Sequence, residues 1–98
     1  MRPRIGITIL FAERATPSEV VGLAKRAEDL GYDMLWMSEA WGRDAFTVLT
    51  HIAANTERIK LAPGIVSIHA RSPASTAQSM ASLDQIAGGR TILGLGVG

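Results

Sequence analysis

The chain has 98 residues, of which 47% are hydrophobic and 19% are charged, and its formal net charge is +1 at pH 7. This balance excludes a disordered tail and fits one globular unit spanning residues 1–98. The basic residues form no stripe, which argues against nucleic acid as a partner, and the lack of cysteine excludes disulfides, thiolate metal sites and redox thiols.

The first predicted elements are a buried strand and an amphipathic helix. Isoleucines alternate with small residues over residues 5–11, which is typical of a strand. Thr16, Pro17 and Glu19 then predict a helix start, with an N-cap, a proline at the first position and a carboxylate that reaches back to the cap. The buried face of this helix is expected to consist of Val20, Leu23, Ala24, Ala27 and Leu30. Gly31 is expected to be its left-handed C-cap.

The middle of the chain repeats this order. A second strand is expected over residues 34–37, and Asp44 is expected to cap a helix that ends at Asn55-Thr56. A third strand is expected over residues 59–68. The Pro63-Gly64 pair inside it predicts a bulge or a bend.

The last predicted elements complete four strands and three helices. Ser72-Pro73 repeats the cap and proline, Gly88-Gly89 ends the third helix, and residues 91–95 form the fourth strand. This alternation predicts a parallel α/β fold, interpreted as the first half of a TIM-type (β/α)8 barrel, with further polypeptide expected after Gly98. Three helices cannot cover both faces of four parallel strands, so one flank is expected to be bare.

Membrane and secretion are not expected. No segment approaches the ~20 apolar residues that span a membrane. The apolar run over residues 5–12 is short, is interrupted by Gly6 and Thr8, and leads directly into charged residues, unlike a secretory signal. A cytoplasmic location is the expectation, which the lack of cysteine also fits.

The chemically rich residues lie in the loops that follow strands, where α/β proteins bind their ligands. Ser38 and Glu39 follow the second strand, and His69 follows the third. Glu39 is interpreted as a site carboxylate that hydrogen bonds a ligand or handles a proton. The alternative is a structural acid paired with Arg43 or Arg71, and these two arginines could instead bind an anionic group.

Other candidate residues keep two interpretations. Trp41 could wall an aromatic ligand or plug the rim of the barrel. His69 could hydrogen bond or protonate a ligand, or be a plain loop residue, while His51 within a helix is interpreted as structural. Two distant histidines without cysteine predict no metal site.

The glycines of residues 93–98 also have two interpretations. No GxGxxG run opens a helix here, so a nucleotide-binding loop is not predicted. The glycines either let a flat ligand approach the end of the strand or allow close packing inside the barrel.

Residues 33–46, 58–66, 71–74 and 88–96, taken in order, resemble the N-terminal part of luciferase-like flavin- or deazaflavin-dependent oxidoreductases. The likeness covers essentially the whole chain. The version of residues 39–46, Glu-Ala-Trp-Gly-Arg-Asp-Ala-Phe, is most similar to the branch that uses coenzyme F420, a deazaflavin hydride carrier.

This resemblance implies a (β/α)8 barrel that holds the tricyclic ring in its mouth and transfers a hydride between the ring and a substrate carbon. It implies that Glu39 lies near the ring, that a non-proline cis peptide bond at Ser67-Ile68 supports the ring, and that residues 96–98 flank it. Ala40 stands where several relatives have a histidine, so proton handling would fall to Glu39 or to residues outside this chain. The implied cofactor contacts are Ser38, Glu39, Ser67, Ile68 and Gly96, and the implied substrate-pocket residues are Phe11, Trp41 and His69.

Three hypotheses for function remain. The first is a piece of an F420-dependent oxidoreductase, or of an FMN-dependent monooxygenase as its close variant, acting on a small-molecule substrate and forming a homo-oligomer. The second is a non-catalytic half-barrel that self-associates through its free strand edges, so that two copies close an eight-stranded ring. The third is an unrelated (β/α) enzyme.

Overall fold

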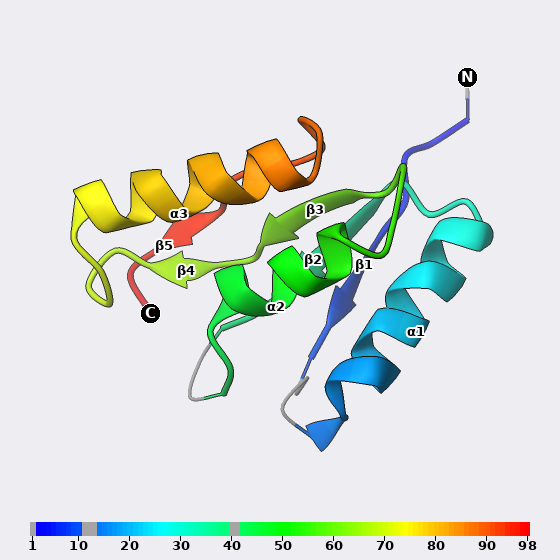
Figure 1. The fold of residues 1–98 in the computed structure, drawn as a ribbon, viewed down its shortest axis with the longest axis horizontal. Helices are drawn as coiled ribbons and strands as arrows, with labels where there is room; N and C mark the ends of the chain where they lie inside the picture. The colour runs from blue at the N-terminus through cyan, green and yellow to red at the C-terminus, as the bar shows by residue number, and fades with distance from the viewer. Residues whose placement is uncertain (1, 11–13, 40–41) are drawn as a thin grey trace.

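The computed structural model describes residues 2–10, 14–39 and 42–98, which form a parallel α/β fold (Figure 1). The strands pair in parallel, in the orders β1-β2-β3 and β4-β5, and a bridge between Leu61 and Thr91 links the two groups. The predicted fold class is confirmed. In chain order the elements are β1 (Gly6–Ile9), α1 (Pro17–Asp29), β2 (Met34–Met37), α2 (Ala45–Ala53), β3 (Lys60–Pro63), β4 (Val66–Ser67), α3 (Pro73–Ile86) and β5 (Leu95–Gly96).

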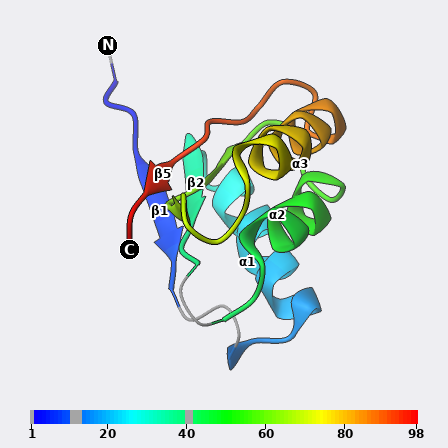
Figure 2. The ribbon, with the colours of Figure 1, turned by 90° about the vertical axis from the view of Figure 1, so that its left-hand side faces the viewer.

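The three helices cover one face of the strands and leave the other face bare, as Figure 2 shows. Side chains alternate along a strand, so one set meets the helices and the other set faces away from them. Ile9, Leu35, Met37 and Leu61 belong to the first set and are buried in the core. The bare flank that the sequence predicted is therefore present in this chain.

The three helices begin where the sequence predicts. Thr16 and Glu19 form the reciprocal capping box, with Glu19 N donating to Thr16 Oγ1 at 3.1 Å and Thr16 N donating to Glu19 Oε1 at 3.0 Å. Asp44 accepts from Thr47 N at 2.9 Å, and Ser72 accepts from Ser75 N at 3.1 Å. These contacts satisfy amides that the first turn of a helix leaves without partners.

The predicted buried face of α1 is wrong at two positions. Val20, Ala24 and Ala27 are buried, but Leu23 and Leu30 are 54% and 59% exposed. The side of α1 that carries Glu28 faces the turn between α2 and β3, because the Glu28 carboxylate accepts three amides from residues 57–59 at 2.6–3.0 Å. Leu23 and Leu30 lie on the opposite flank of the helix and point away from α2.

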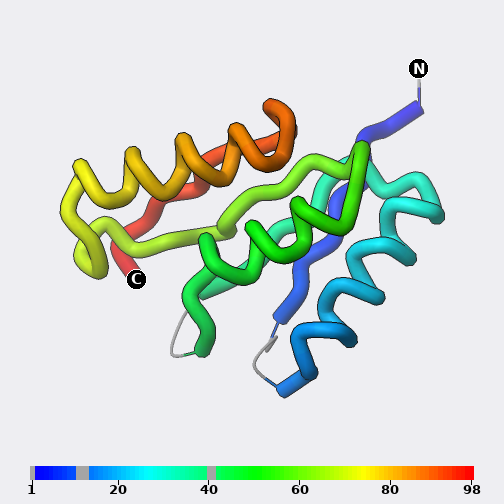
Figure 3. Tube along the Cα trace, in the orientation of Figure 1, coloured from blue at the N-terminus to red at the C-terminus, as the bar shows by residue number. Residues whose placement is uncertain are grey.

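The predicted third strand is divided by a bend, and the predicted fourth strand is wrong in extent. Figure 3 traces residues 60–67 as one extended path from β3 into β4. Val66 follows Leu61 by five positions, whereas the partner of Val66, Leu95, follows the partner of Leu61, Thr91, by only four. The extra residue is accommodated as a bulge in the β3–β4 path, which interrupts regular pairing and leaves β5 as residues 95–96.

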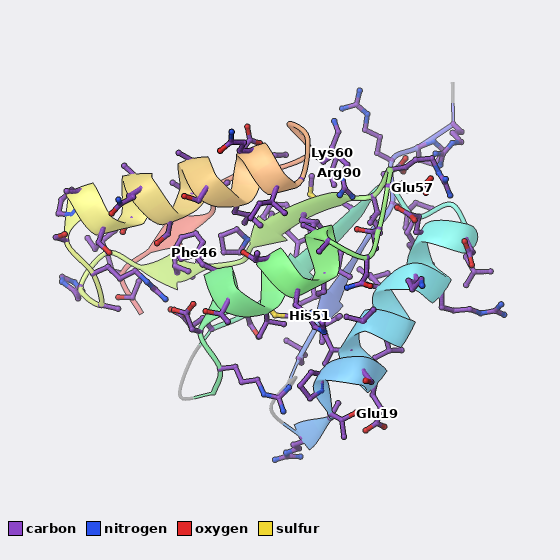
Figure 4. The ribbon with its side chains drawn as sticks, in the orientation of Figure 1. Glu19, Phe46, His51, Glu57, Lys60 and Arg90 are labelled. Atoms are coloured by element: carbon purple, nitrogen blue, oxygen red, sulfur yellow. The ribbon has the colours of Figure 1, made fainter. Side chains whose placement is uncertain are left out.

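Arg90 fastens the end of α2 to the chain between α3 and β5 (Figure 4). Its guanidinium donates to the carbonyl oxygens of Ala53, Thr56, Ile59 and Ala87 and to Thr56 Oγ1, over distances of 2.7–3.2 Å. A cation beside the carbonyl end of a helix is favourable, so this is a structural arginine. None of the helices described is both long enough and apolar enough to cross a membrane.

Candidate functional site

Glu39 and Arg71 form a two-pronged ion pair at the carboxyl end of β2. Arg71 donates to Glu39 Oε1 at 2.8 Å and to Glu39 Oε2 at 2.7 Å, and the two side chains are only 15% and 12% exposed. Glu39 Oε2 also accepts the amide of Ala45, the first residue of α2, at 2.6 Å. The pair thus joins the end of β2, the start of α2 and the loop before α3.

Asp44 and Phe46 complete the surroundings of Arg71. The Asp44 carboxylate caps α2, as predicted, and also pairs with Arg71. The Arg71 guanidinium carbon lies 4.9 Å from the centre of the Phe46 ring, which Figure 4 shows on the side of α2 toward α3. Two carboxylates and an aromatic ring therefore surround the Arg71 guanidinium.

The electrostatics keep Glu39 ionised. Hydrogen bonds from Arg71 lower the pKa of Glu39 despite the opposing effect of burial, and the Ala45 amide lowers it further. Burial opposes the shift at Asp44 too, but hydrogen bonds from Thr47 and Arg71 lower its pKa. The pKa of Arg71 is raised, mainly by its hydrogen bonds to Glu39. Glu39 can accept hydrogen bonds near neutral pH, but it carries no proton to donate. The proposed pairing with Arg71 is present, and a catalytic role for Glu39 stays a prediction.

A second group of predicted residues meets at the ends of β4 and β5. Ser67 is the pairing partner of Gly96, and Ile68 N donates to the Gly96 carbonyl at 2.8 Å. His69 N donates to Ser67 Oγ at 3.1 Å, which places His69 beside the same strand end. The structure therefore brings Ser67, Ile68, His69 and Gly96 together.

An apolar hollow connects this strand end to the ion cluster. Its volume is about 240 Å³, and both Ile68 and Arg71 line it. The remaining lining residues are Pro73, Thr76, Ala77, Leu93 and Leu95. We call it the α3–β5 hollow.

The predicted position of the cis peptide bond is wrong. The cis bond joins Gly64 to Ile65, three residues before Ser67-Ile68. The chain bends at Gly64 rather than at the strand end, and Gly64 lies against the indole of Trp36, where an added Cβ would be 2.8 Å from Trp36 Cε3. Ser67 instead continues as regular strand β4.

The glycines of β5 and of the chain before it are explained by close packing. A Cβ at Gly94 would overlap the carbonyl oxygen of Pro63, and a Cβ at Gly96 would overlap the Ile65 side chain. Both glycines therefore let the β3–β4 bend approach β5. The sequence left open whether these glycines admit a flat ligand or allow close packing, and the contacts at Gly94 and Gly96 support close packing.

Trp36 is a residue that the sequence interpretation missed. It lies on the bare face of the strands and lines a cavity of about 330 Å³, together with Arg4, Met34, Lys60 and Ile92 among others. The alternation of Met34 to Met37 could have predicted this, because Leu35 and Met37 occupy the buried face. Phe11 and Trp41 lie outside the described residues, as does Ala40. Within the part of the chain that the structure describes, no three His, Asp or Glu residues are placed to hold a metal.

Comparison with known proteins places these features in a family. The family model described as luciferase-like monooxygenase matches residues 4–98. A 5,10-methylenetetrahydromethanopterin reductase of Methanolobus tindarius is 43% identical over 81 residues, which is 82% of this chain and 25% of the relative. An F420-dependent glucose-6-phosphate dehydrogenase of Kineococcus radiotolerans is 34% identical over 97 residues, covering 89% of this chain and 29% of the relative.

A solved structure agrees. The coenzyme F420-dependent tetrahydromethanopterin reductase of Methanopyrus kandleri matches with a TM-score of 0.90 and 38% identity, over 97% of this chain and 27% of that one. The chain thus spans roughly a quarter of the length of the relatives it matches. The family model covers residues 4–98, and the solved reductase structure matches 97% of this chain. The chain therefore belongs to the luciferase-like monooxygenase family.

Proposed function

We propose that this chain forms the first part of the barrel of an oxidoreductase that transfers a hydride between coenzyme F420 and a small organic substrate. The observation that carries the proposal is the 38% identity and TM-score of 0.90 to an F420-dependent reductase. The relatives are three to four times longer, so we propose that the chain needs the remaining barrel strands for activity. The composition supports a cytoplasmic location as part of the same proposal.

The residues at the strand ends fit the ring of such a cofactor. Ile68 is 48% exposed at the end of β4, and residues 96–98 beside it are two glycines and a valine. Val97 is exposed as well, and exposed apolar side chains such as Ile68 and Val97 form a surface on which a flat ring can lie. The residues do not fit the cofactor phosphate equally well, because Arg71 is held by Glu39 and Asp44.

The cofactor would supply the hydride chemistry, and the residues of this chain would shape the site. In the proposal Glu39 remains an anion that fixes the end of β2 to α2 through Ala45 and Arg71. Ser38 and Ser67 offer hydroxyl groups at neighbouring strand ends. His69 is exposed beside Ser67, and we propose that its imidazole exchanges protons with a ligand in the mouth.

A chimera tests the proposal. In the Methanopyrus reductase, the segment that matches this chain is replaced by residues 4–98, and the purified chimera is titrated with F420 and with FMN. We expect F420 binding and reduction of F420 when the reductase's own substrate is supplied, with the unmodified reductase as the positive control. A chimera that melts cooperatively but binds neither cofactor would contradict the proposal.

A luciferase-like monooxygenase that uses FMN is the second candidate. The description of the matching family favours it, because that family is described as monooxygenases. The same titration separates the two candidates: preferential binding of reduced FMN, with oxygen consumption, would support the monooxygenase.

A further inference from the structure

The indole of Trp36 lies between two glycines of the neighbouring strands. β2 is the middle strand of β1-β2-β3, and Trp36 pairs with Thr8 on one side and with Ala62 on the other. A Cβ at Gly6 in β1 would lie 3.4 Å from Trp36 Nε1, and a Cβ at Gly64, directly after β3, would lie 2.8 Å from Trp36 Cε3. The indole therefore extends from Gly6 toward Gly64, over positions where no side chain competes for the space.

The contact with Gly64 is the tighter of the two, and it lies at the bend between β3 and β4. Backbone hydrogen bonds hold this bend on both sides. Gly64 N donates to the Met37 carbonyl at 2.8 Å, and Val66 N donates to the Gly94 carbonyl at 3.0 Å. Because the indole is rigid and the bend is anchored, the size of the side chain at position 36 sets how closely the bend approaches β2.

The bend carries this contact to the strand end where the proposed ring lies. Gly64 is followed by Ile65, whose side chain occupies the space that a Cβ at Gly96 would need. Gly96 in turn pairs with Ser67, and its carbonyl accepts the amide of Ile68 at 2.8 Å. Packed contacts thus lead without a gap from the indole to the backbone at the ends of β4 and β5, and close-packed interiors transmit strain.

We propose that Trp36 is a positioning residue for the cofactor ring. Its indole supports the β3–β4 bend, and the bend sets the places of Ser67, Ile68 and Gly96 at the strand end. This inference rests on the proposed function and adds a residue that acts on the ring through others. A misplacement of about 1 Å in a site can cost on the order of a hundredfold in rate, so the effect on hydride transfer should exceed the effect on folding.

The chimera that carries residues 4–98 tests the role of Trp36. Met34→Ala is the matched control for Trp36→Ala, since Met34 lies on the same face of β2 but beside Gly6, away from the bend. We expect Trp36→Ala to raise the cofactor Kd about tenfold and to slow single-turnover hydride transfer at saturating cofactor by about tenfold or more. Met34→Ala should change both by less than about twofold. Trp36→Phe keeps an aromatic ring and should change both by a few fold, so the test does not depend on the alanine variant folding.

A second measurement needs no cofactor. Gly64→Ala places a Cβ against the indole, so it should lower the melting temperature of the cofactor-free chimera. In the double variant with Trp36→Ala the indole is gone and the Cβ has room. The double variant should therefore lose less stability than the sum of the two single losses. Strictly additive losses would show that the indole does not support the bend, and they would overturn the inference.

The outcomes separate this inference from the proposed function. A chimera that binds cofactor, but in which Trp36→Ala and Met34→Ala change Kd and hydride transfer equally, would overturn the positioning role and leave the proposed function intact. A chimera that binds FMN instead of F420 is compared in the same way, with FMN binding and the oxidation of reduced FMN as the readouts. A chimera that binds neither cofactor would contradict the proposed function, and the positioning role would fail with it.

Discussion

Removing the guanidinium of Arg71 is the most direct test of the ion cluster. In Arg71→Met, the Glu39 carboxylate keeps the Ala45 amide but loses its cation, while its side chain remains only 12% exposed. Breaking a fully buried pair on one side costs roughly 3–5 kcal/mol. Because Asp44 is half exposed and water reaches part of the cluster, we expect a smaller loss of about 2–3 kcal/mol, including about 0.5–1 kcal/mol from the contact with Phe46.

Urea unfolding followed by circular dichroism measures this loss. With a slope of about 1–3 kcal/mol per molar urea, the midpoint should fall by roughly 1–2 M. Lys25→Met on the exposed surface of α1 removes a cation of similar length and should change the unfolding free energy by less than about 0.5 kcal/mol. A double-mutant cycle with Glu39→Gln then isolates the pair, and a coupling energy near zero would refute the cluster.

The pH dependence gives the cluster a second signature. The pKa values of Glu39 and Asp44 are lowered in the folded chain, so their contribution to stability is present above their unfolded values and is lost as pH falls through the folded ones. The difference in unfolding free energy between wild type and Arg71→Met should therefore be full at pH 7 and shrink below about pH 4. A difference that stays constant down to pH 3 would mean that the carboxylates do not sense Arg71.

Three further predictions concern stability. Arg90→Met should destabilise the chain by about 3 kcal/mol in urea unfolding, because it leaves carbonyls at the end of α2 without a donor; an unchanged midpoint would contradict this. Gly96→Ala should cost about 1–3 kcal/mol in thermal unfolding, since its Cβ meets Ile65, whereas Gly22→Ala, whose Cβ meets nothing within 4 Å, should be neutral or stabilising. Thr16→Ala should cost about 1 kcal/mol through loss of the cap, and Thr16→Ser should retain most of it.

Local chemistry explains which parts of the fold the sequence predicts well. The starts of α1, α2 and α3 depend on Thr16, Asp44 and Ser72, each acting on amides within three residues, and all three predictions are confirmed. The extent of β5 depends instead on the bulge opposite it, which is fixed by contacts across the sheet. The exposure of Leu23 could not be predicted for the same reason. Helical spacing identifies the apolar stripe of α1, but it does not tell which side of that stripe packs against another element.

The site was half predictable for the same reason. Position alone indicated a carboxylate at the end of β2 and gave Arg43 and Arg71 as its possible partners. Choosing between them needs the path of the chain, because Arg71 is 32 residues from Glu39 and reaches it only once α2 and α3 lie side by side. Arg43, four residues away, donates to the Ala15 carbonyl instead.

The geometry of Glu39 also changes where proton handling is to be sought. A general acid must carry a proton near its working pH, which requires burial or a neighbouring negative charge to raise the pKa. Arg71 and the Ala45 amide do the opposite at Glu39, and they occupy both of its oxygens. His69 lies exposed at the neighbouring strand end, and imidazole is a common proton carrier in enzymes. In the chimera, His69→Gln should therefore alter the pH profile of turnover, whereas Glu39→Gln should lower stability and cofactor affinity without moving that profile.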